Sequence, residues 1–248
     1  MDDLQTPCLL VSLPALERNE ATMRTLMRGS NVALRPHAKA HKSSTLAAWH
    51  IRRSQGDLAG FCAQTVVEAE MLVRGGASDI LITNTLPPRG ATSLAALAAA
   101  HPSVSLGTLV DCDAHVIALK AAASSAGTRL RVLVEIECGM DRCGVAAGSD
   151  ASVRLACAII AAAPVLEWGG LHIYAGNLGQ IKSLGDRRAA VAAGPAAAAA
   201  SAVAVFKTHG IDVPAVTGGG TGTALLDMSA GYLSELQAGS YLLMDGNY

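Results

Sequence analysis

The amino-acid sequence predicts an α/β protein built as a (β/α)₈ barrel, and two observations carry that prediction. Short aliphatic, β-branched runs of strand length alternate with helical patterns eight times along 248 residues, close to the ~250 residues typical of this barrel. The strand runs also lack regular alternation of apolar and polar residues, as expected when helices cover a parallel sheet. A doubly wound open sheet is the alternative fold that the same pattern leaves open.

Helical patterns fall between the strand runs in successive strand–helix units, and one further helical pattern, at 13–27, precedes the first strand. The strands are expected at 32–34 running on to Lys39, 58–63, 79–84, 104–110, 130–137, 168–174, 215–218 and 236–242. The helices are expected at 13–27, 43–55, 65–74, 91–100, 113–125, 149–162, 182–209 and 224–233. A further strand at 8–12 precedes the first helix and belongs to no unit. Because no interdomain linker is visible, residues 1–248 are expected to form a single domain.

The composition excludes several classes of protein. Apolar residues make up 51% of the chain and aromatic residues only 3%, so the core must be built from aliphatic side chains. A net charge of −1 without long runs of one sign argues against nucleic-acid binding. The start of the chain has acidic residues where a secretory signal needs basic ones. No window reaches ~18 uninterrupted apolar residues, so no membrane span is expected; the alanine-rich tract at 189–206 comes nearest.

Six cysteines are scattered along the chain. They form no C-x-x-C pair, and none is expected to have a histidine partner at metal-ligand spacing. We therefore predict no metal site, reduced thiols and a cytoplasmic location.

The segment LRPHAKAHKS at 34–43 is the most informative stretch of the sequence. Pro36 favours an extended conformation for the residue before it. If the strand continues, His37, Lys39 and His41 point to one side. Like charges crowded at a strand end lower the proton affinity of a lysine, which makes Lys39 a candidate amine nucleophile for a Schiff base with a carbonyl. A solvated basic loop is the alternative.

Polar residues follow the strands at their carboxyl ends, where a barrel of this kind places its active site. These residues are Lys39 and His41, Gln64, Asn84, the segment 135–142 with Arg142, His172 and Tyr174, the glycine run 217–223, and Tyr241 with Asp245. Arg142 could contact a cofactor or pair with Asp141 or Glu137. His172 could transfer protons or be a hydrogen-bonded core residue.

The run TGGGTGT at 217–223 lets the backbone approach an anion closely. Its amide groups, together with the start of the next helix, could hold a phosphate, although a tight turn explains the run as well. A lysine after the first strand and a phosphate cradle after the seventh predict a phosphorylated aldehyde. Pyridoxal phosphate (PLP) is the obvious candidate, with Gln64, Arg142 and Tyr174 contacting or orienting its ring.

Several segments together resemble the D-threonine aldolase / D-serine dehydratase group, fold-type III PLP enzymes with an alanine-racemase-like barrel. These are TPCLLV (6–11), LRPHAKAHKS, VVEAEMLVRGGASDILITN (66–84), VEIECGMDRCGV (134–145), GLHIYAG (170–176), TGGGTGT and ELQAGSYLLMDGNY (235–248). The resemblance implies that Lys39, not Lys42, carries the cofactor. It further implies cofactor contacts from Gln64, Arg142, Tyr174, Gly219, Gly220 and Thr221, with His37 and Tyr241 as additional candidates.

Two departures from that group matter. Its members continue into a β-rich second domain that supplies a His plus Asp or Cys pair for a divalent metal (Mn, Mg or Zn). Those ligands are expected to be absent from this chain, and the strand at 8–12 would normally pair with that domain. In the aldolase branch a histidine follows the tyrosine of strand six. Ala175 stands there in this sequence, which leaves His172 as the candidate for that role.

The resemblance implies a PLP-dependent lyase acting on D-3-hydroxy amino acids, with retro-aldol cleavage of D-threonine-type substrates to glycine and an aldehyde as the leading reaction. A D-serine-type dehydratase on the same site, a PLP-binding barrel without turnover and an inactive truncated product are the alternatives. Whether two chains pair as a homodimer is left open.

Overall fold

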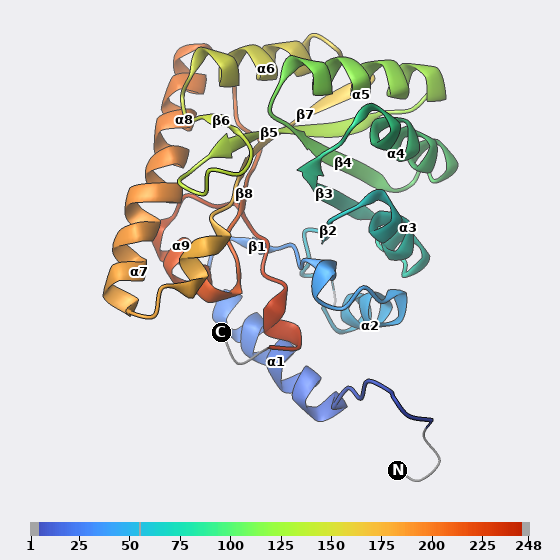
Figure 1. The fold of residues 1–248 in the computed structure, drawn as a ribbon, viewed down its shortest axis with the longest axis vertical. Helices are drawn as coiled ribbons and strands as arrows, with labels where there is room; N and C mark the ends of the chain where they lie inside the picture. The colour runs from blue at the N-terminus through green and yellow to red at the C-terminus, as the bar shows by residue number, and fades with distance from the viewer. Residues whose placement is uncertain (1–4, 55, 245–248) are drawn as a thin grey trace.

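The computed structural model describes residues 5–54 and 56–244, so the expected helix end at Gln55 and the candidate Asp245 lie outside the described residues. Eight strands run parallel in one sheet, in the order β1-β9-β8-β7-β5-β4-β3-β2. Two further bridges, Leu34 to Leu58 and His37 to Cys62, join β1 to the β2 segment. The sheet therefore closes on itself as a barrel with helices outside (Figure 1), and the expected (β/α)₈ architecture is confirmed over the open sheet.

The barrel strands begin and end close to the expected positions. They are β1 Ala33–Leu34, β2 Phe61–Ala63, β3 Asp79–Thr85, β4 Ser105–Val110, β5 Leu130–Glu137, β7 Leu166–Ile173, β8 Val216–Gly218 and β9 Glu235–Leu236. A short additional strand, β6 Val145–Ala146, pairs with the end of β5 and was not expected.

The helices alternate with the strands and cover the outside of the barrel (Figure 1). They are α1 Leu13–Met27, α2 Ser44–Ser54, α3 Val66–Arg74, α4 Pro88–Ala100, α5 Asp113–Ala126, α6 Asp150–Ile160, α7 Leu184–Val191, α8 Ala197–Thr208 and α9 Ala224–Ala230. Hydroxyl N-caps set several starts: the side chains of Thr65, Ser149 and Ser183 each accept a hydrogen bond from a backbone N–H three residues on. Gly127 ends α5 in the left-handed conformation that glycine adopts without strain.

Two strands are shorter than the sequence predicted. The first strand ends at Leu34, and Lys39 lies instead in a 3₁₀ turn, Ala38–Ala40. The turn forms because Nδ1 of His37 accepts the backbone N–H of Lys39 at 3.3 Å, a local bond that competes with strand pairing. The eighth strand likewise ends at Leu236, and a second 3₁₀ turn, Ser240–Leu242, follows it.

The expected strand at 8–12 was wrong. The chain there is irregular and projects beyond α1, away from the barrel (Figure 1). Its apolar side chains are exposed, with Leu9 at 100% and Leu10 at 65%. A strand needs a partner for its backbone groups, and no described residue pairs with this segment.

The expected helix at 182–209 contains an irregularity. A π-helical segment, Ala192–Ala196, separates α7 from α8 and includes Pro195, which has no N–H to continue the ladder. By length and composition alone, Leu184–Thr208 could cross a membrane, with a mean hydropathy of 1.8. In this fold it packs along the barrel, with Ala202 and Phe206 buried.

The main core lies between the strands and the helices and is mostly aliphatic, as the composition predicts. A second, smaller cluster of Leu81, Leu109 and Leu133 fills the inside of the barrel. All six cysteines are free thiols.

Below that inner cluster, a buried ion network ties the amino-terminal ends of four strands together. Arg35, 2% exposed, donates from Nε and Nη2 to Glu235 at 2.7 and 2.8 Å. Its Nη1 donates to Asp79, which also accepts two bonds from Arg131 at 2.6 and 2.7 Å. Gly60 leaves room for this arrangement: a Cβ there would collide with the guanidinium of Arg35 and lie 2.6 Å from the carbonyl oxygen of Asp79.

Replacing Asp79 by alanine should destabilise the fold, because Arg131 would lose its carboxylate partner and Arg35 one of two. We expect the free energy of unfolding to fall by about 3 kcal/mol, as when one member of a buried pair is removed. Urea denaturation followed by circular dichroism measures the loss. Glu70→Ala, which removes an exposed pair with Arg74, is the matched control and should cost at most about 1 kcal/mol. Equal losses of stability in the two variants would contradict a stabilising role for the buried network.

Low pH should abolish the stabilisation that Asp79 provides. Burial alone would raise the pKa of Asp79, but Arg131 and Arg35 outweigh it and hold the pKa below its ordinary value. A carboxyl with a depressed pKa stabilises the fold above its unfolded pKa of ~3.9 and loses that contribution as pH falls through the folded value. The stability gap between wild type and Asp79→Ala should therefore shrink as the pH is lowered from neutral towards about 3. A gap that is constant with pH would contradict this expectation.

Candidate active site

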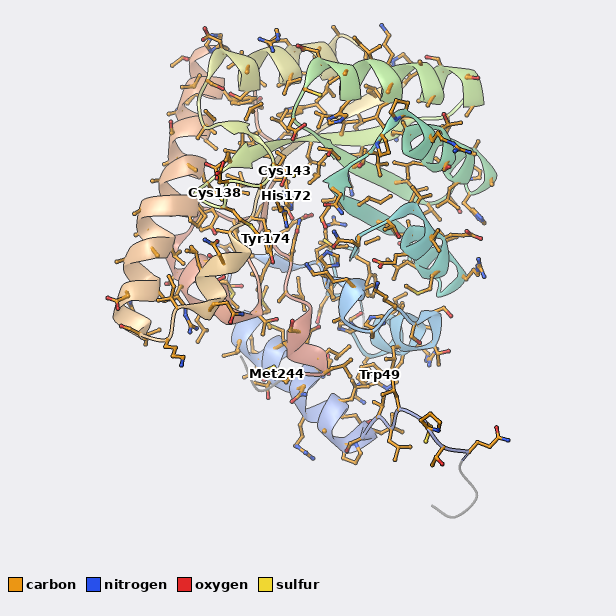
Figure 2. The ribbon with its side chains drawn as sticks, in the orientation of Figure 1. Trp49, Cys138, Cys143, His172, Tyr174 and Met244 are labelled. Atoms are coloured by element: carbon orange, nitrogen blue, oxygen red, sulfur yellow. The ribbon has the colours of Figure 1, made fainter. Side chains whose placement is uncertain are left out.

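A small cavity lies at the carboxyl ends of the strands, around the amine of Lys39. It is lined by His37, Lys39, Gln64, Thr83, Arg142, His172, Tyr174 and Gln237. Six of these eight residues were expected from the sequence. His172 and Tyr174 follow one another from the end of β7 towards the middle of the ring of strands (Figure 2), with their ring centroids 6.4 Å apart.

The amine of Lys39 and the guanidinium of Arg142 both face the ring of Tyr174. Lys39 Nζ lies 5.4 Å from the ring centroid and Arg142 Cζ lies 5.3 Å from it. Burial lowers the pKa of Lys39, and the charge of Arg142 lowers it further. The neutral, nucleophilic form of this amine is therefore more populated than in a solvent-exposed lysine.

Lys42 has a different environment. Its Nζ lies 3.2 Å from Glu68 Oε1, and its side chain is 66% exposed. A left-handed backbone (φ 48°) follows the turn that holds Lys39, so the two lysines do not share a face. The cavity therefore contains Lys39 and not Lys42.

His37 supports the floor of the cavity and carries no charge. Its Nδ1 accepts the N–H of Lys39, so its proton resides on Nε2, which lies 3.0 Å from Thr83 Oγ1. Burial, with the nearby charges of Lys39 and His172, lowers the pKa of His37 to about 2. The imidazole is therefore neutral at physiological pH and orients the turn rather than adding to the positive charge.

His172 is 1% exposed and is held from both sides. Its Nε2 lies 3.1 Å from Gln237 Oε1, and Gln237 in turn donates to Thr217 Oγ1 at 2.8 Å. Its Nδ1 lies 3.5 Å from Glu135 Oε1, longer than an ordinary hydrogen bond. Burial raises the pKa of Glu135, but His172 and Arg142 outweigh that effect and hold it below its usual value. Glu135 thus gives the site a buried negative charge.

The salt-bridge partner of Arg142 differs from both that were expected. Arg142 Nη2 lies 3.7 Å from Glu135 Oε1, not near Asp141 or Glu137. Glu137 Oε1 instead accepts the backbone N–H groups of residues 139, 140 and 141, at 2.7, 2.7 and 2.9 Å. This carboxylate therefore shapes the loop so that Arg142 can turn towards the cavity.

The glycine run approaches the same tyrosine from another side. A Cβ on Gly220 would lie 3.9 Å from a ring carbon of Tyr174. Gly219 has φ +68°, and a Cβ there would lie 2.6 Å from Oδ2 of the buried Asp227. Arg187 of α7 donates to the carbonyl of Gly222 at 2.8 Å and so braces the run from the outside.

Asp227 sets the conformation of the glycine run from beneath. Its Oδ2 accepts the hydroxyl of Thr223 at 2.6 Å, and its Oδ1 accepts that of Tyr232 at 2.8 Å. Burial raises the pKa of Asp227, although these bonds and one from the N–H of Gly220 oppose the shift. The Gly220 amide is therefore already engaged within the fold.

Gly219, Gly220, Thr221 and Tyr241 do not line the Lys39 cavity. The hydroxyl of Tyr241 lies 3.0 Å from Nε2 of His50 on α2, because the 3₁₀ turn after β9 directs its ring towards that helix. Its backbone N–H donates to Thr221 Oγ1 at 3.0 Å. Tyr241 therefore contacts the glycine run through its backbone, and its side chain is directed to α2.

The donor set fits PLP. The amine of Lys39 stands on one side of the Tyr174 ring, the glycine run stands on another, and the guanidinium of Arg142 also faces it. An aromatic aldehyde with a phosphate at its far end needs these three features: a nucleophile, a flat apolar contact and a positively charged or N–H-rich end. The shared contact with Tyr174 also places Lys39 and the glycine run on the same rim of the barrel.

The sequence reasoning missed several groups that the fold brings together. Thr83 and Gln237 line the cavity. Thr83 could have been predicted from strand alternation, because it lies two residues after Leu81 and four after Asp79, which both point into the barrel. The expectation that no cysteine has a histidine at metal spacing was also wrong. Cys112 and His115 stand three residues apart at the start of α5, with Sγ and Nδ1 3.3 Å apart.

Comparison with known proteins gives three informative similarities. The chain is 38% identical over 247 residues to a 3-hydroxy-D-aspartate aldolase from Paracoccus denitrificans, covering 99% of this chain and 62% of the relative. It is 29% identical to a D-threo-3-hydroxyaspartate dehydratase from a Delftia species, with 98% and 62% covered. The crystal structure of D-threonine aldolase from Filomicrobium marinum superposes with a TM-score of 0.90 at 37% identity, covering 99% of this chain and 64% of that one.

This chain therefore spans about three-fifths of the length of its curated relatives, 62% in both cases. The family described as "Alanine racemase, N-terminal domain" matches residues 11–246, which is nearly the whole chain and includes every strand of the barrel. The protein belongs to the alanine racemase N-terminal domain family.

Proposed function

We propose that this protein is a PLP-dependent lyase that cleaves D-3-hydroxy amino acids to glycine and an aldehyde. One observation carries the proposal: the amine of Lys39, with its lowered pKa, faces a tyrosine ring that also contacts the glycine run. The similar proteins named for aldol cleavage of 3-hydroxy-D-aspartate and D-threonine support the reaction class.

PLP, when bound, supplies an electron sink for the bonds at the substrate Cα. Lys39 Nζ is the nucleophile that would hold the cofactor, and as a neutral amine it can also take or return a proton. The charge of Arg142 adds to the effect of burial in lowering the pKa of that amine, and its guanidinium is available to an anionic ring oxygen. The ring of Tyr174 would pack against the cofactor, and Thr221 with the amides of the glycine run other than that of Gly220 would hold its phosphate.

Two histidines would divide the remaining tasks. His37, neutral and bonded to the backbone of Lys39, holds the nucleophile in its turn without competing for protons. His172 lines the cavity, and its Nε2–H donates to Gln237 Oε1, so its Nδ1, beside Glu135, is the proposed acceptor for the proton of the substrate hydroxyl. Glu135 would stabilise the charge that His172 gains in doing so.

A dehydratase is the second candidate, because one relative is named for that reaction. The same site would serve it if Lys39 removed the proton from Cα and the hydroxyl left as water. Carbon–carbon cleavage needs proton removal from the hydroxyl instead, so the two reactions differ in which proton the protein accepts.

Lys39→Ala should abolish the visible absorbance band that appears when PLP binds to the protein, because the amine that lines the cavity is removed. Lys42→Ala should keep the band, since Lys42 pairs with Glu68 outside the cavity. Absorbance spectra after dialysis against PLP make the measurement, and circular dichroism checks that both variants fold. A band that survives in Lys39→Ala would overturn the proposed site.

Arg142→Gln should move the pH profile of PLP binding to higher pH. Removing the guanidinium takes away one cause of the lowered pKa of Lys39, so less neutral amine is present at a given pH. The rate of PLP binding should be lower than wild type at pH values below the lysine pKa and should converge with it above. Arg142→Lys, which keeps the charge, is the control. A loss that is equal at every pH would show that Arg142 contributes contacts alone.

The substrate class is tested by product analysis. With PLP and Mn²⁺ added, D-threonine should give glycine and acetaldehyde in equal amounts, and 3-hydroxy-D-aspartate should give glycine and glyoxylate. Keto acid and ammonia from D-serine would instead favour the dehydratase. Bound PLP with no product from any of these would contradict both lyase assignments and favour a cofactor-binding barrel without turnover.

A further inference from the structure

Three side chains of different chemistry converge immediately after β4, at the carboxyl end of the barrel. Asp111 follows the last residue of the strand, Cys112 precedes α5, and His115 lies in its first turn. Nδ1 of His115 lies 3.0 Å from Asp111 Oδ1 and 3.3 Å from Cys112 Sγ, and the three ligand atoms all lie within 4.8 Å of one another. We propose that this cluster binds a thiophilic divalent metal ion such as Zn²⁺.

The spacing of these atoms suits tetrahedral coordination. Zinc bonds of ~2.0 Å to oxygen or nitrogen and ~2.3 Å to sulfur place two ligands about 3.3 Å apart for N and O, and about 3.5 Å apart for N and S. The observed separations of 3.0 and 3.3 Å are shorter by only a few tenths of an ångström. Small side-chain rotations would therefore admit the ion, without movement of the strand or the helix.

The kinds of ligand select the metal. A thiolate, an imidazole and a carboxylate together favour zinc or another borderline-soft ion, whereas magnesium and calcium prefer oxygen ligands alone. Cys112 also does not cap the helix that follows it. It occupies the N-cap of α5 but accepts no hydrogen bond from the helix, because its sulfur turns towards His115.

The surroundings leave the site accessible and anchor one ligand. Asp111 and His115 retain 21% and 24% side-chain exposure, and Cys112 is exposed. The second carboxylate oxygen of Asp111 accepts the N–H of Gly144 at 3.2 Å, which fixes the carboxylate and leaves Oδ1 for the metal. Three protein ligands leave one position for water. On binding, the thiol proton of Cys112 would pass to solvent.

Metal binding here would also connect to the Lys39 cavity. Gly144 belongs to the loop that carries Arg142, and Asp111 holds that loop through the Gly144 amide. An ion on Asp111 would fix the carboxylate more rigidly and restrict the loop. The metal proposal does not depend on the proposed lyase activity, since it rests on ligand geometry outside the cavity.

Cobalt is the appropriate probe, because a cobalt–thiolate bond gives an absorption band in the near ultraviolet and tetrahedral cobalt absorbs in the visible. Chelator-treated protein is titrated with Co²⁺, and difference spectra cancel other chromophores. We expect one Co²⁺ per chain at this site, displaced by Zn²⁺ but not by Mg²⁺. Cys112→Ser should remove the near-ultraviolet band, and His115→Ala should weaken Co²⁺ binding by at least about tenfold.

Cys157→Ser is the matched control, since Cys157 is an exposed thiol on α6 and no partner in the cluster depends on it. It should leave the band and the affinity unchanged. Absence of a thiolate band in the wild type, or a band that survives in Cys112→Ser, would overturn the proposal. Loss of the band in Cys157→Ser would overturn it as well, by placing the metal elsewhere.

Discussion

Arg35 is enclosed by two carboxylates at the amino-terminal end of the barrel, and the positions of the groups above it depend on that contact. Glu235 comes from β9, which pairs with β1, and Asp79 comes from β3 on the far side of β2, where it also holds Arg131. Because removing charges from water is costly, such a network persists only when every member is paired. Arg35 precedes His37 by two residues and Lys39 by four. Fixing the side chain of Arg35 therefore also fixes the position, along the barrel axis, of the turn that carries the Lys39 amine.

Above this network the interior changes from ionic to apolar and then to polar again. The leucine cluster separates the buried ions from the cavity and keeps the two groups of charges from neutralising each other. Beside the cavity, Arg142 faces the carboxylate of Glu135, while His37 is kept neutral by burial. The side chain of Arg142 stays 39% exposed, so its charge is accessible to an anionic ligand at this end of the barrel.

Much of the fold follows from the sequence because the strands are buried on both sides. The run at 130–137 has few alternatives to a strand, and the structure has the same bounds. Lys39, Arg142 and Tyr174 were found by their places after strands, which the barrel brings to one rim. The turn at Lys39 was not found, because it depends on one bond from the His37 ring to a backbone N–H. That bond competes locally with strand pairing, and the pattern of apolar residues does not reveal it.

Other features depend on tertiary context that no sequence window contains. The direction of the Tyr241 ring is set by His50, nearly two hundred residues away in the chain. The residues at 8–12 have strand-like composition, yet composition does not supply a neighbouring strand. The pairing of Arg142 with Glu135 in place of Glu137 arises because Glu137 caps three amides of its own loop, a geometry visible only once that loop is folded.

The π-helical segment between α7 and α8 is what one additional residue in an α-helix produces. Each residue turns an α-helix by about 100°, so winding Ala192–Ala196 as a regular α-helix, with the additional residue kept, would rotate everything before it by about that angle relative to α8. Arg187 would swing away from the carbonyl of Gly222, and the glycine run would lose its outer brace. The π-helical segment thus sets the direction in which Arg187 points from the outer helix. With a regular α-helix in its place, Arg187 would no longer support the glycine run.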